Sequence, residues 1–391
     1  MLWWRVLPPS SLPETIVNYR PLRLVHITMY RDLPSGIRKQ ITWEQLASKH
    51  LKGIEWTSLV VHGGEAVEPF EKRIPFALRL MFLRNLYVWL IVIRLSRAYD
   101  LVLLRHIPFD PFVFLFAPLI RNRVSVHHSR EWQELPLIRP GLAGRLAGSL
   151  ELISGWFSVR CAIGVLGVTN EIARFQVDRR APAKPAGLYA NGISLDDVEV
   201  VDDLRSSNSV HVVFISNTFS EWHGLDRLVN SVRQSPMIPY DLTFHIIGHL
   251  SKLQKMQITE LGLPASLFRL HGFLATDAYR SLLSTADIGL GSLAMDRQSL
   301  TEGATLKVRE MLGMGIAVYS GHTDTALPAS FPFYRKVSSL DLAALERFAR
   351  SMKQHSRLEI RKAAAPFIDK VATMQVAADW LSELHADLPD R

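Results

Sequence analysis

The chain has little of what several classes of protein require. Cys161 is its only cysteine, which excludes an internal disulfide and a cysteine-based zinc site and fits a reducing compartment. No Asp-x-Asp occurs, and the histidines have no metal-ligand spacing with carboxylates, so a metal-held diphosphate is not expected. The Gly-x-Gly-x-x-Gly turn of dinucleotide-dependent oxidoreductases and the nucleophile elbow of hydrolases are also missing.

Long uncharged apolar stretches are also missing. The apolar start of the chain reaches Pro8 and Pro9 within two turns, too soon for a signal peptide. Residues 76–95 are the most apolar stretch, but three arginines interrupt it, whereas a spanning helix needs ~20 nearly uncharged residues. This stretch predicts a helix that is either buried in the core or lies flat on an anionic membrane. We therefore expect a cytoplasmic protein, peripheral at most on the inner face of a membrane.

The two halves of the chain differ in charge. Residues 1–190 carry 25 Lys and Arg against 14 Asp and Glu, whereas residues 191–391 carry 20 against 23. The basic half suits an anionic partner, either a membrane surface or a phosphate-bearing acceptor, although a solvated basic face explains it equally well. Basic residues are not interleaved with aromatic ones in runs, so nucleic acid is not an expected partner.

Short β-branched runs alternate with amphipathic ones, which predicts βα units and parallel sheets. A length of 391 residues exceeds the ~250 at which single cores stop growing, so two domains are expected. The candidate strands are 22–28, 58–61, 101–104, 123–126 and 162–168 in the first half, and 210–216, 243–248, 267–270, 288–291 and 316–319 in the second.

A Pro- and Gly-rich passage at 179–194 separates the two series of strands. We expect Rossmann-like domains at residues 1–190 and 191–370, and a C-terminal helix at 371–391 that can pack back on the first domain. Two doubly wound domains of this kind place the ends of both sheets around one central cleft, where such folds bind ligands.

Residues 301–315 carry the strongest motif of the chain. Glu302 lies in an expected loop, Gly303 lets the backbone approach a ligand, and Thr305 can cap a helix that runs through Glu310 to Met314. The backbone around Ala304 and Thr305 then offers free N–H groups to an anion such as a diphosphate. Lys307 adds a cation in the first helical turn.

This motif resembles the E-x7-E signature of the retaining glycosyltransferases of family 4. Glu302 and Glu310, the glycine at 315 and the apolar strand at 316–318 match it. The resemblance implies an α/β fold of the GT-B type, with two doubly wound Rossmann-like domains facing a central cleft. It also implies a nucleotide-diphosphate sugar as donor, no separate cofactor, a catalytic Glu302 near the transferred sugar, and Glu310 on the ribose.

A second match lies at 212–229, which resembles the strand, loop and helix start that open the family's donor domain. The cationic pair that many members use for the diphosphate is absent, because Ser216-Asn217 and His223 stand in its place, although Trp222-His223-Gly224 resembles a variant found in the family. His223, Gly224, Arg227 and Lys307 become the predicted diphosphate residues, with Arg227 as readily a surface residue. Gly272 and Phe273 resemble a turn beside the nucleotide base, although a βα turn with a buried Phe explains them nearly as well.

The first half resembles the family only in patches. His127 ends a predicted strand where the family has a histidine near the transferred sugar, and strand register decides whether it or His128 faces the cleft. Gly36 belongs to a loop after the first strand, and Arg38 and Lys39 suit an anionic acceptor unless they are merely solvated.

The hypothesis is transfer of a sugar to a glycan or lipid-linked acceptor, with retention and without metal, in polysaccharide or surface glycan assembly. Two alternatives stay open. One is a sugar-nucleotide epimerase of related architecture, which needs no acceptor site. The other is a catalytically silent subunit that binds nucleotide sugar, an option raised by the missing cationic pair.

Overall fold

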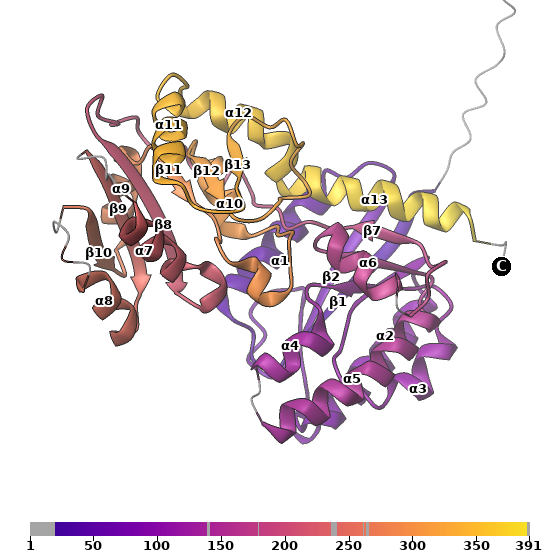
Figure 1. The fold of residues 1–391 in the computed structure, drawn as a ribbon. Helices are drawn as coiled ribbons and strands as arrows, with labels where there is room; N and C mark the ends of the chain where they lie inside the picture. The colour runs from indigo at the N-terminus through magenta and orange to yellow at the C-terminus, as the bar shows by residue number, and fades with distance from the viewer. Residues whose placement is uncertain are drawn as a thin grey trace, which may run out of the picture.

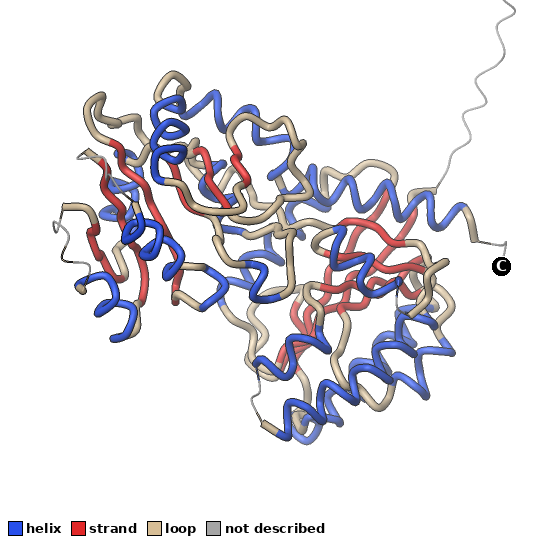
Figure 2. The backbone as a smooth tube through the Cα atoms, in the orientation of Figure 1, coloured by secondary structure: helices blue, strands red, loops and turns tan. Residues whose placement is uncertain are grey.

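The computed structural model describes residues 20–138, 141–178, 180–235, 241–260, 262 and 266–388. Two α/β units follow each other, each built on one parallel sheet with helices packed on it (Figures 1 and 2). The first sheet has the order β3-β2-β1-β4-β5-β6-β7 and the second the order β10-β9-β8-β11-β12-β13. In each sheet the strand order reverses beside the first strand of the unit, as in doubly wound folds.

The first unit contains β1 (Leu22–Tyr30), α1 (Ser35–Ser48), β2 (Ile54–His62), β3 (Glu71–Arg73), α2 (Met81–Ser96), β4 (Leu101–Arg105), α3 (Val113–Phe116), β5 (Arg123–His127), α4 (Glu131–Ile138), α5 (Leu142–Cys161), β6 (Gly164–Gly167), α6 (Asn170–Asp178) and β7 (Ala186–Leu188). The central strands β4 and β5 are almost wholly buried, because a parallel sheet is covered on both faces. This burial accounts for the unbroken apolar runs from which the strands were predicted.

The second unit contains β8 (Val210–Thr218), α7 (Leu225–Gln234), β9 (Leu242–His249), α8 (Lys252–Thr259), β10 (Phe268–Gly272), α9 (Thr276–Thr285), β11 (Ile288–Leu290), α10 (Leu306–Gly313), β12 (Ala317–Ser320), β13 (Tyr334–Lys336), α11 (Leu342–Met352) and α12 (Arg357–Ile368). A last helix, α13 (Lys370–Ala386), follows directly. One large apolar core fills this unit, with members from Ile193 to Ile368, and it also includes Trp43 of α1.

The apolar helix α2 belongs to the core of the first unit. Val88, Trp89 and Val92 are buried against the sheet, and the Trp89 indole donates a hydrogen bond to Asp110. The structure shows burial for one side of this stretch, whereas Phe76, Leu80, Phe82 and Leu90 are 43% to 85% exposed. Docking of residues 76–95 on an anionic membrane stays a prediction. Among the described helices, none is long and apolar enough to span a membrane.

The chain crosses between the two units twice, at neighbouring positions. Ile193 pairs with Asp369 in a parallel bridge, and the backbone of Ile193 bonds to Ile368 and Lys370 on either side. Beyond this point α13 runs back over the first sheet, as Figure 1 shows in yellow. Its buried side chains, among them Met374 and Leu381, share a core with the first sheet.

A buried carboxylate ties this arrangement together. Glu44 of α1 accepts hydrogen bonds from His26 Nδ1 (2.8 Å), Trp56 Nε1 (3.0 Å), Ser58 Oγ (2.5 Å) and the Tyr189 hydroxyl (2.6 Å). Lys370, the first residue of α13, donates to the same hydroxyl at 3.0 Å and lies 3.9 Å from the carboxylate. The start of α13, at Lys370, thus meets the end of the first unit, at Tyr189, in one polar cluster.

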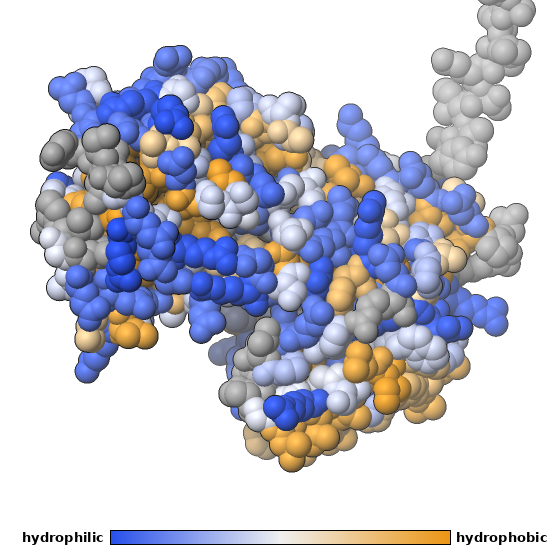
Figure 3. Space-filling model, viewed as in Figure 1, coloured by the Kyte–Doolittle hydropathy of each residue, from blue (hydrophilic) through white to orange (hydrophobic). Residues whose placement is uncertain are grey.

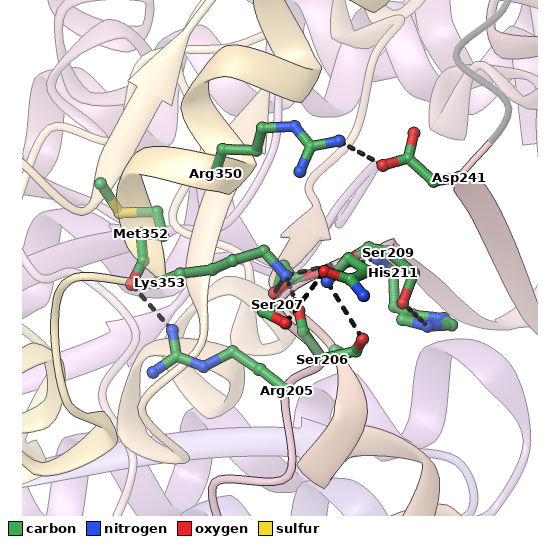
Figure 4. A network of polar contacts seen from close by, with 12 residues as sticks. Arg205, Ser206, Ser207, Ser209, His211, Asp241, Arg350, Met352 and Lys353 are labelled. Atoms are coloured by element: carbon green, nitrogen blue, oxygen red, sulfur yellow. Dashed lines mark hydrogen bonds and ion pairs between the residues drawn. The ribbon is translucent and has the colours of Figure 1, made fainter.

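The segment before β8 is fastened to the second unit by polar contacts (Figure 4). The Arg205 guanidinium donates to the Met352 carbonyl at 2.7 Å. Lys353 Nζ donates to the Ser209 carbonyl at 2.7 Å and pairs with Asp287 at 2.8 Å. These contacts hold the segment that leads into β8 against the end of α11.

Candidate functional site

The loop before α10 lies against the first domain. Glu302 Oε2 accepts a hydrogen bond of 2.6 Å from the backbone N–H of Glu171, in the first turn of α6. In return, Glu171 Oε2 accepts from the backbone N–H groups of Thr301 (2.8 Å) and Glu302 (2.9 Å). Arg130 holds the other Glu171 oxygen at 2.7 Å. Glu302 and Glu171 therefore form a reciprocal latch between the domains.

Burial, joined by the charge of Glu171, raises the pKa of Glu302. A cavity of about 510 Å³ opens beside the latch, lined by Glu302, Arg130 and residues of α6. Gly303 is packed so closely that an added Cβ would lie 2.7 Å from the His322 ring. Gly303 was predicted to let the backbone approach a ligand closely. In this structure the group that lies close to its backbone is the His322 side chain.

Helix α10 begins at Leu306, and Thr305 occupies the N-cap position. The Thr305 side chain does not cap the helix, because its buried Oγ1 makes no hydrogen bond with any described residue. The helix ends at Gly313, one residue before the predicted end. Ala304 is buried, and its carbonyl accepts a bond of 2.8 Å from the Asn191 side chain. The prediction that the Thr305 hydroxyl caps α10 is therefore wrong, and the first N–H groups of this helix have no side-chain cap.

Lys307 has the most unusual environment in this region. Its Nζ is buried and has no hydrogen-bond partner among the described residues. The ammonium lies 5.4 Å from the centre of the Phe214 ring and 5.7 Å from that of Trp222. Burial lowers the pKa of Lys307 to about 7. A cation held by aromatic faces without an anion is a site that an anionic ligand can complete.

Trp222-His223-Gly224 lies beside this lysine, but His223 is not a cation. Its Nδ1 accepts a hydrogen bond from the Ser220 N–H at 2.9 Å, and its Nε2 contacts Ser216 Oγ at 3.1 Å. Burial, together with the charge of Lys307, lowers the pKa of His223 to about 4. The neutral ring, with both nitrogens engaged, positions the loop. A contact of His223 with a diphosphate stays a prediction.

Gly224 has φ of 77°, a left-handed conformation that favours glycine, and it precedes α7. Arg227, in the first turn of α7, donates to the Leu293 carbonyl at 2.9 Å and pairs with Asp296 at 2.6 Å. Its guanidinium therefore holds the loop after β11. Of the two predicted roles for Arg227, the structure shows a structural surface residue.

Glu310 stands on α10, where the two domains face each other. Its carboxylate makes no hydrogen bond or ion pair with any described residue, and it is only partly exposed. Burial raises the pKa of Glu310, while Lys39 of the first domain opposes the rise. On the other side, the negative charge of Glu310 adds to the burial that raises the pKa of Tyr279. Glu310 is thus an unused acceptor beside α9 and α1.

Gly272 ends β10 with φ of 64°, and no atom lies within 4 Å of the position of an added Cβ. Phe273 follows and is 70% exposed. The alternative in which Phe273 is an ordinary buried side chain of a βα turn is therefore wrong. An exposed aromatic ring is available at this strand end.

His127 and His128 occupy different environments. His127 is fully buried, with Nδ1 at 3.0 Å from Glu131 Oε1 and Nε2 at 2.9 Å from Ser125 Oγ. Its ring stacks on His106 with 4.5 Å between centroids. His128 is partly exposed and lines two neighbouring cavities. The structure therefore corrects the choice of His127 as the ring that faces the site.

The cavity that His128 lines has a volume of about 310 Å³ and lies at the carboxyl ends of β1, β4 and β5. Arg31, Arg84 and Arg105 contribute to its wall, and Arg105 contacts the hydroxyl of Tyr30. Burial and the charge of Arg105 hold the pKa of His128 well below its ordinary value. The sequence prediction missed these arginines. Arg105 ends a strand, so the strand-end rule that selected His127 could have found it.

Of Arg38 and Lys39, the two predicted cations on α1, only Arg38 has an acidic hydrogen-bond partner among the described residues. Gly36 is exposed in the first turn, with open space around it. Arg38 pairs with Glu71 of β3 at 2.5 Å, so its charge is already balanced within the first domain. Lys39 is exposed over the Trp43 ring at 4.9 Å. Arg38 is therefore corrected to a structural role, whereas Lys39 stays a candidate for an anionic ligand.

Comparison with known proteins adds information on the fold. No family model matches the chain, and no curated protein does. Solved structures do match, among them a glycosyltransferase from Rickettsia africae ESF-5, with a TM-score of 0.60, 13% identity, and coverage of 95% of this chain and 100% of that chain. Sucrose-phosphate synthase from Thermosynechococcus elongatus matches with a TM-score of 0.60, 13% identity and coverage of 94% and 100%.

HepE from Anabaena, solved in complex with UDP-glucose, matches with a TM-score of 0.54, 16% identity and coverage of 94% and 100%. These likenesses confirm the predicted GT-B fold, since both domains and their arrangement are covered. Assignment to family 4 stays a prediction. The described residues contain no cluster of three or more His, Cys, Asp or Glu that could hold a metal ion.

Proposed function

We propose that the protein transfers a sugar from a nucleotide-diphosphate donor to an anionic glycan or lipid-linked acceptor. The observation that carries this proposal is Lys307, a buried ammonium without an anionic partner, at the start of α10 in a GT-B fold. A diphosphate supplies the missing charge, and the uncapped N–H groups of the same helix turn add to its binding.

Three further side chains complete the donor site in this proposal. Glu310 accepts hydrogen bonds from the ribose hydroxyls, because its carboxylate has no other partner among the described residues. Phe273, exposed at the end of β10, stacks on the nucleotide base. Glu302 binds hydroxyls of the transferred sugar, which requires its bond to the Glu171 N–H to be exchanged.

The acceptor occupies the cavity of the first domain. Arg31, Arg84 and Arg105 outnumber Glu131, the one carboxylate of the wall, and leave a positive charge that matches a phosphate or carboxylate group. His128 lies in the same wall, and its lowered pKa leaves it neutral, so the ring can orient the acceptor hydroxyl. This cavity favours a transferase over an epimerase, which has no need of an acceptor site.

Transfer proceeds with retention and without metal in this account. The acceptor hydroxyl attacks the sugar carbon on the face of the leaving group, forming one C–O bond as the bond to the diphosphate breaks. The departing diphosphate oxygen takes the hydroxyl proton. Lys307 stabilises the negative charge that develops on that oxygen. The setting is assembly of polysaccharide or surface glycan.

One assay separates the three functions. The protein is incubated with a panel of sugar nucleotides, with and without lipid-linked and phosphorylated acceptors, and the products are analysed by mass spectrometry. Transfer predicts an acceptor heavier by one sugar and a released nucleoside diphosphate. Epimerisation without acceptor supports an epimerase, and tight binding without turnover supports a silent subunit. Either of these two results overturns the proposal.

A further inference from the structure

Helix α5 turns an apolar stripe outward. Leu142, Leu146, Leu150, Ile153 and Trp156 are between 41% and 73% exposed. Their spacing of three and four residues places them on one side of the helix. The opposite side, which includes Ala147 and Glu151, is buried against the first domain.

The stripe continues onto a neighbouring element. Phe114, Leu115 and Leu119, in α3 and the turn after it, are 44% to 66% exposed. The Phe114 ring packs on Phe157 of α5 with 5.0 Å between centroids. These eight exposed residues of α5, α3 and the following turn form what we call the α5–α3 face. Figure 3 shows apolar surface gathered over this part of the first domain.

The charges around this face have one sign. Arg121, Arg145 and Arg160 are exposed there, and Arg160 lies over the Trp156 ring at 4.9 Å. The only acidic residues in 111–165 are Glu131, Glu134 and Glu151, none of which is exposed. The face therefore combines apolar side chains with a rim of positive charge.

We propose that the α5–α3 face docks on an anionic lipid bilayer. Apolar side chains enter the region between headgroups and acyl chains, and the arginines pair with lipid phosphates. An apolar face of this extent is unusual on a monomer without a partner. A second copy is a poorer occupant, because a two-fold interface brings the same arginines against each other.

The docked face is connected rigidly to the acceptor cavity. Glu151, on the inner side of α5, holds His106 Nε2 at 2.9 Å and accepts from the Phe109 N–H at 2.7 Å. His106 and the two residues after it line the cavity with Arg105. If the proposed function holds, membrane docking thus fixes the acceptor site close to lipid-linked substrates. The docking itself does not depend on that function.

The test measures binding of the full chain to vesicles, without donor or acceptor. Vesicles of phosphatidylcholine with phosphatidylglycerol are compared with phosphatidylcholine alone by co-sedimentation. The variant Leu146→Glu/Ile153→Glu is expected to bind anionic vesicles at least ~10-fold more weakly. The control Leu253→Glu/Met256→Glu changes two residues of α8 that are 65% and 55% exposed, and it is expected to bind normally.

A second variant tests the electrostatic part. Arg145→Gln/Arg160→Gln is expected to weaken binding roughly fivefold for each arginine and to reduce its salt dependence. Thermal unfolding of every variant establishes that the fold is retained. The proposal is overturned if the wild-type protein ignores anionic vesicles, or if the α5 variant binds as well as the α8 control. Loss of a dimer in light scattering, without vesicle binding, would assign the face to a second copy instead.

Discussion

Lys307 carries the donor site at the scale of single residues. Folding buries its ammonium against two aromatic rings and leaves it without an anion, which lowers its pKa to about 7. An anion bound beside it must raise that pKa again. Binding of a nucleoside diphosphate near pH 7 or above is therefore expected to take up a proton.

This uptake is measurable by titration calorimetry in buffers of different ionisation enthalpy. Donor affinity in the wild-type protein is expected to fall as pH rises above about 7, because the free lysine loses its proton there. Lys307→Met should bind ~10- to 100-fold more weakly and without proton uptake. Lys252→Met removes an exposed lysine of α8 as the control. Equal affinity and equal uptake in Lys307→Met would contradict the account.

Substitutions of Glu302 and Glu310 should affect different kinetic quantities. Glu310→Ala is expected to raise the donor Kd roughly 10-fold, because it removes an acceptor for the ribose. Glu302→Ala is expected to lower kcat more than donor affinity, because its sugar contact forms after the latch to Glu171 opens. The measurements are donor titrations and steady-state rates. Near wild-type values in both variants would remove the motif from the site.

Residue types and spacing predicted which segments line the site, but not how each side chain is used. His223 and Arg227 were predicted as cations from their place in a loop and a helix start. The structure commits them to Ser216, Ser220 and Asp296, which come from other parts of the domain. Such partners depend on tertiary packing, so single-sequence reasoning could not identify them.

At the scale of elements, the turn from Glu302 into α10 depends on one glycine. A Cβ on Gly303 would lie 2.7 Å from the His322 ring, so Gly303→Ala must displace the loop or the ring. We expect a loss of ~1–3 kcal/mol in the free energy of unfolding, together with weaker donor binding. Gly36→Ala is the matched control, because open space surrounds that position. Chemical denaturation measures both, and an equal effect in the two variants would contradict the packing described.

The strand cores were predictable because buried parallel strands read as short apolar runs. The three-residue strands β3, β7 and β13 were missed, and β7 lies within the Pro- and Gly-rich passage that marks the domain boundary. Gly187 in this strand meets the Trp380 ring of α13, where an added Cβ would lie 2.5 Å from it. Gly187 and Trp380 are far apart in the sequence, so no local sequence pattern predicts their contact.

At the scale of the whole molecule, Glu44 and Lys370 connect the first domain to the last helix. The interactions of Glu44 with His26, Lys370 and Ser58 outweigh its burial and hold its pKa well below the usual range. A carboxyl with a depressed folded-state pKa stabilises the fold above about pH 4.5, and this stabilisation is lost as pH falls. The cluster therefore makes the docking of α13 sensitive to acid.

Glu44→Gln is expected to lower the free energy of unfolding by ~3–5 kcal/mol at pH 7, because Lys370 is left buried without its charged partner. Its stability should also fall less steeply below pH 4.5 than that of the wild-type protein. Denaturant unfolding across pH measures both effects. Glu65→Gln, at an exposed position, is the control. A loss no larger than that of the control would show that the cluster does not hold α13.

The two-domain architecture followed from chain length and from the two series of strands, and the GT-B fold from the resemblance around Glu302 and Glu310. The reciprocal bonds of Glu302 and Glu171 could not be predicted, because they depend on how the domains face each other. In the arginine-lined cavity, Arg105 could have been found from its place at a strand end, but its meeting with Arg31 and Arg84 depends on tertiary packing.

A crystal structure of the protein soaked with a series of nucleotide sugars tests the central claim most directly. We expect a diphosphate oxygen within ~3 Å of Lys307 Nζ, with the ribose on Glu310 and the base beside Phe273. A nucleotide sugar bound away from Lys307, or a diphosphate held by other cations, would contradict it.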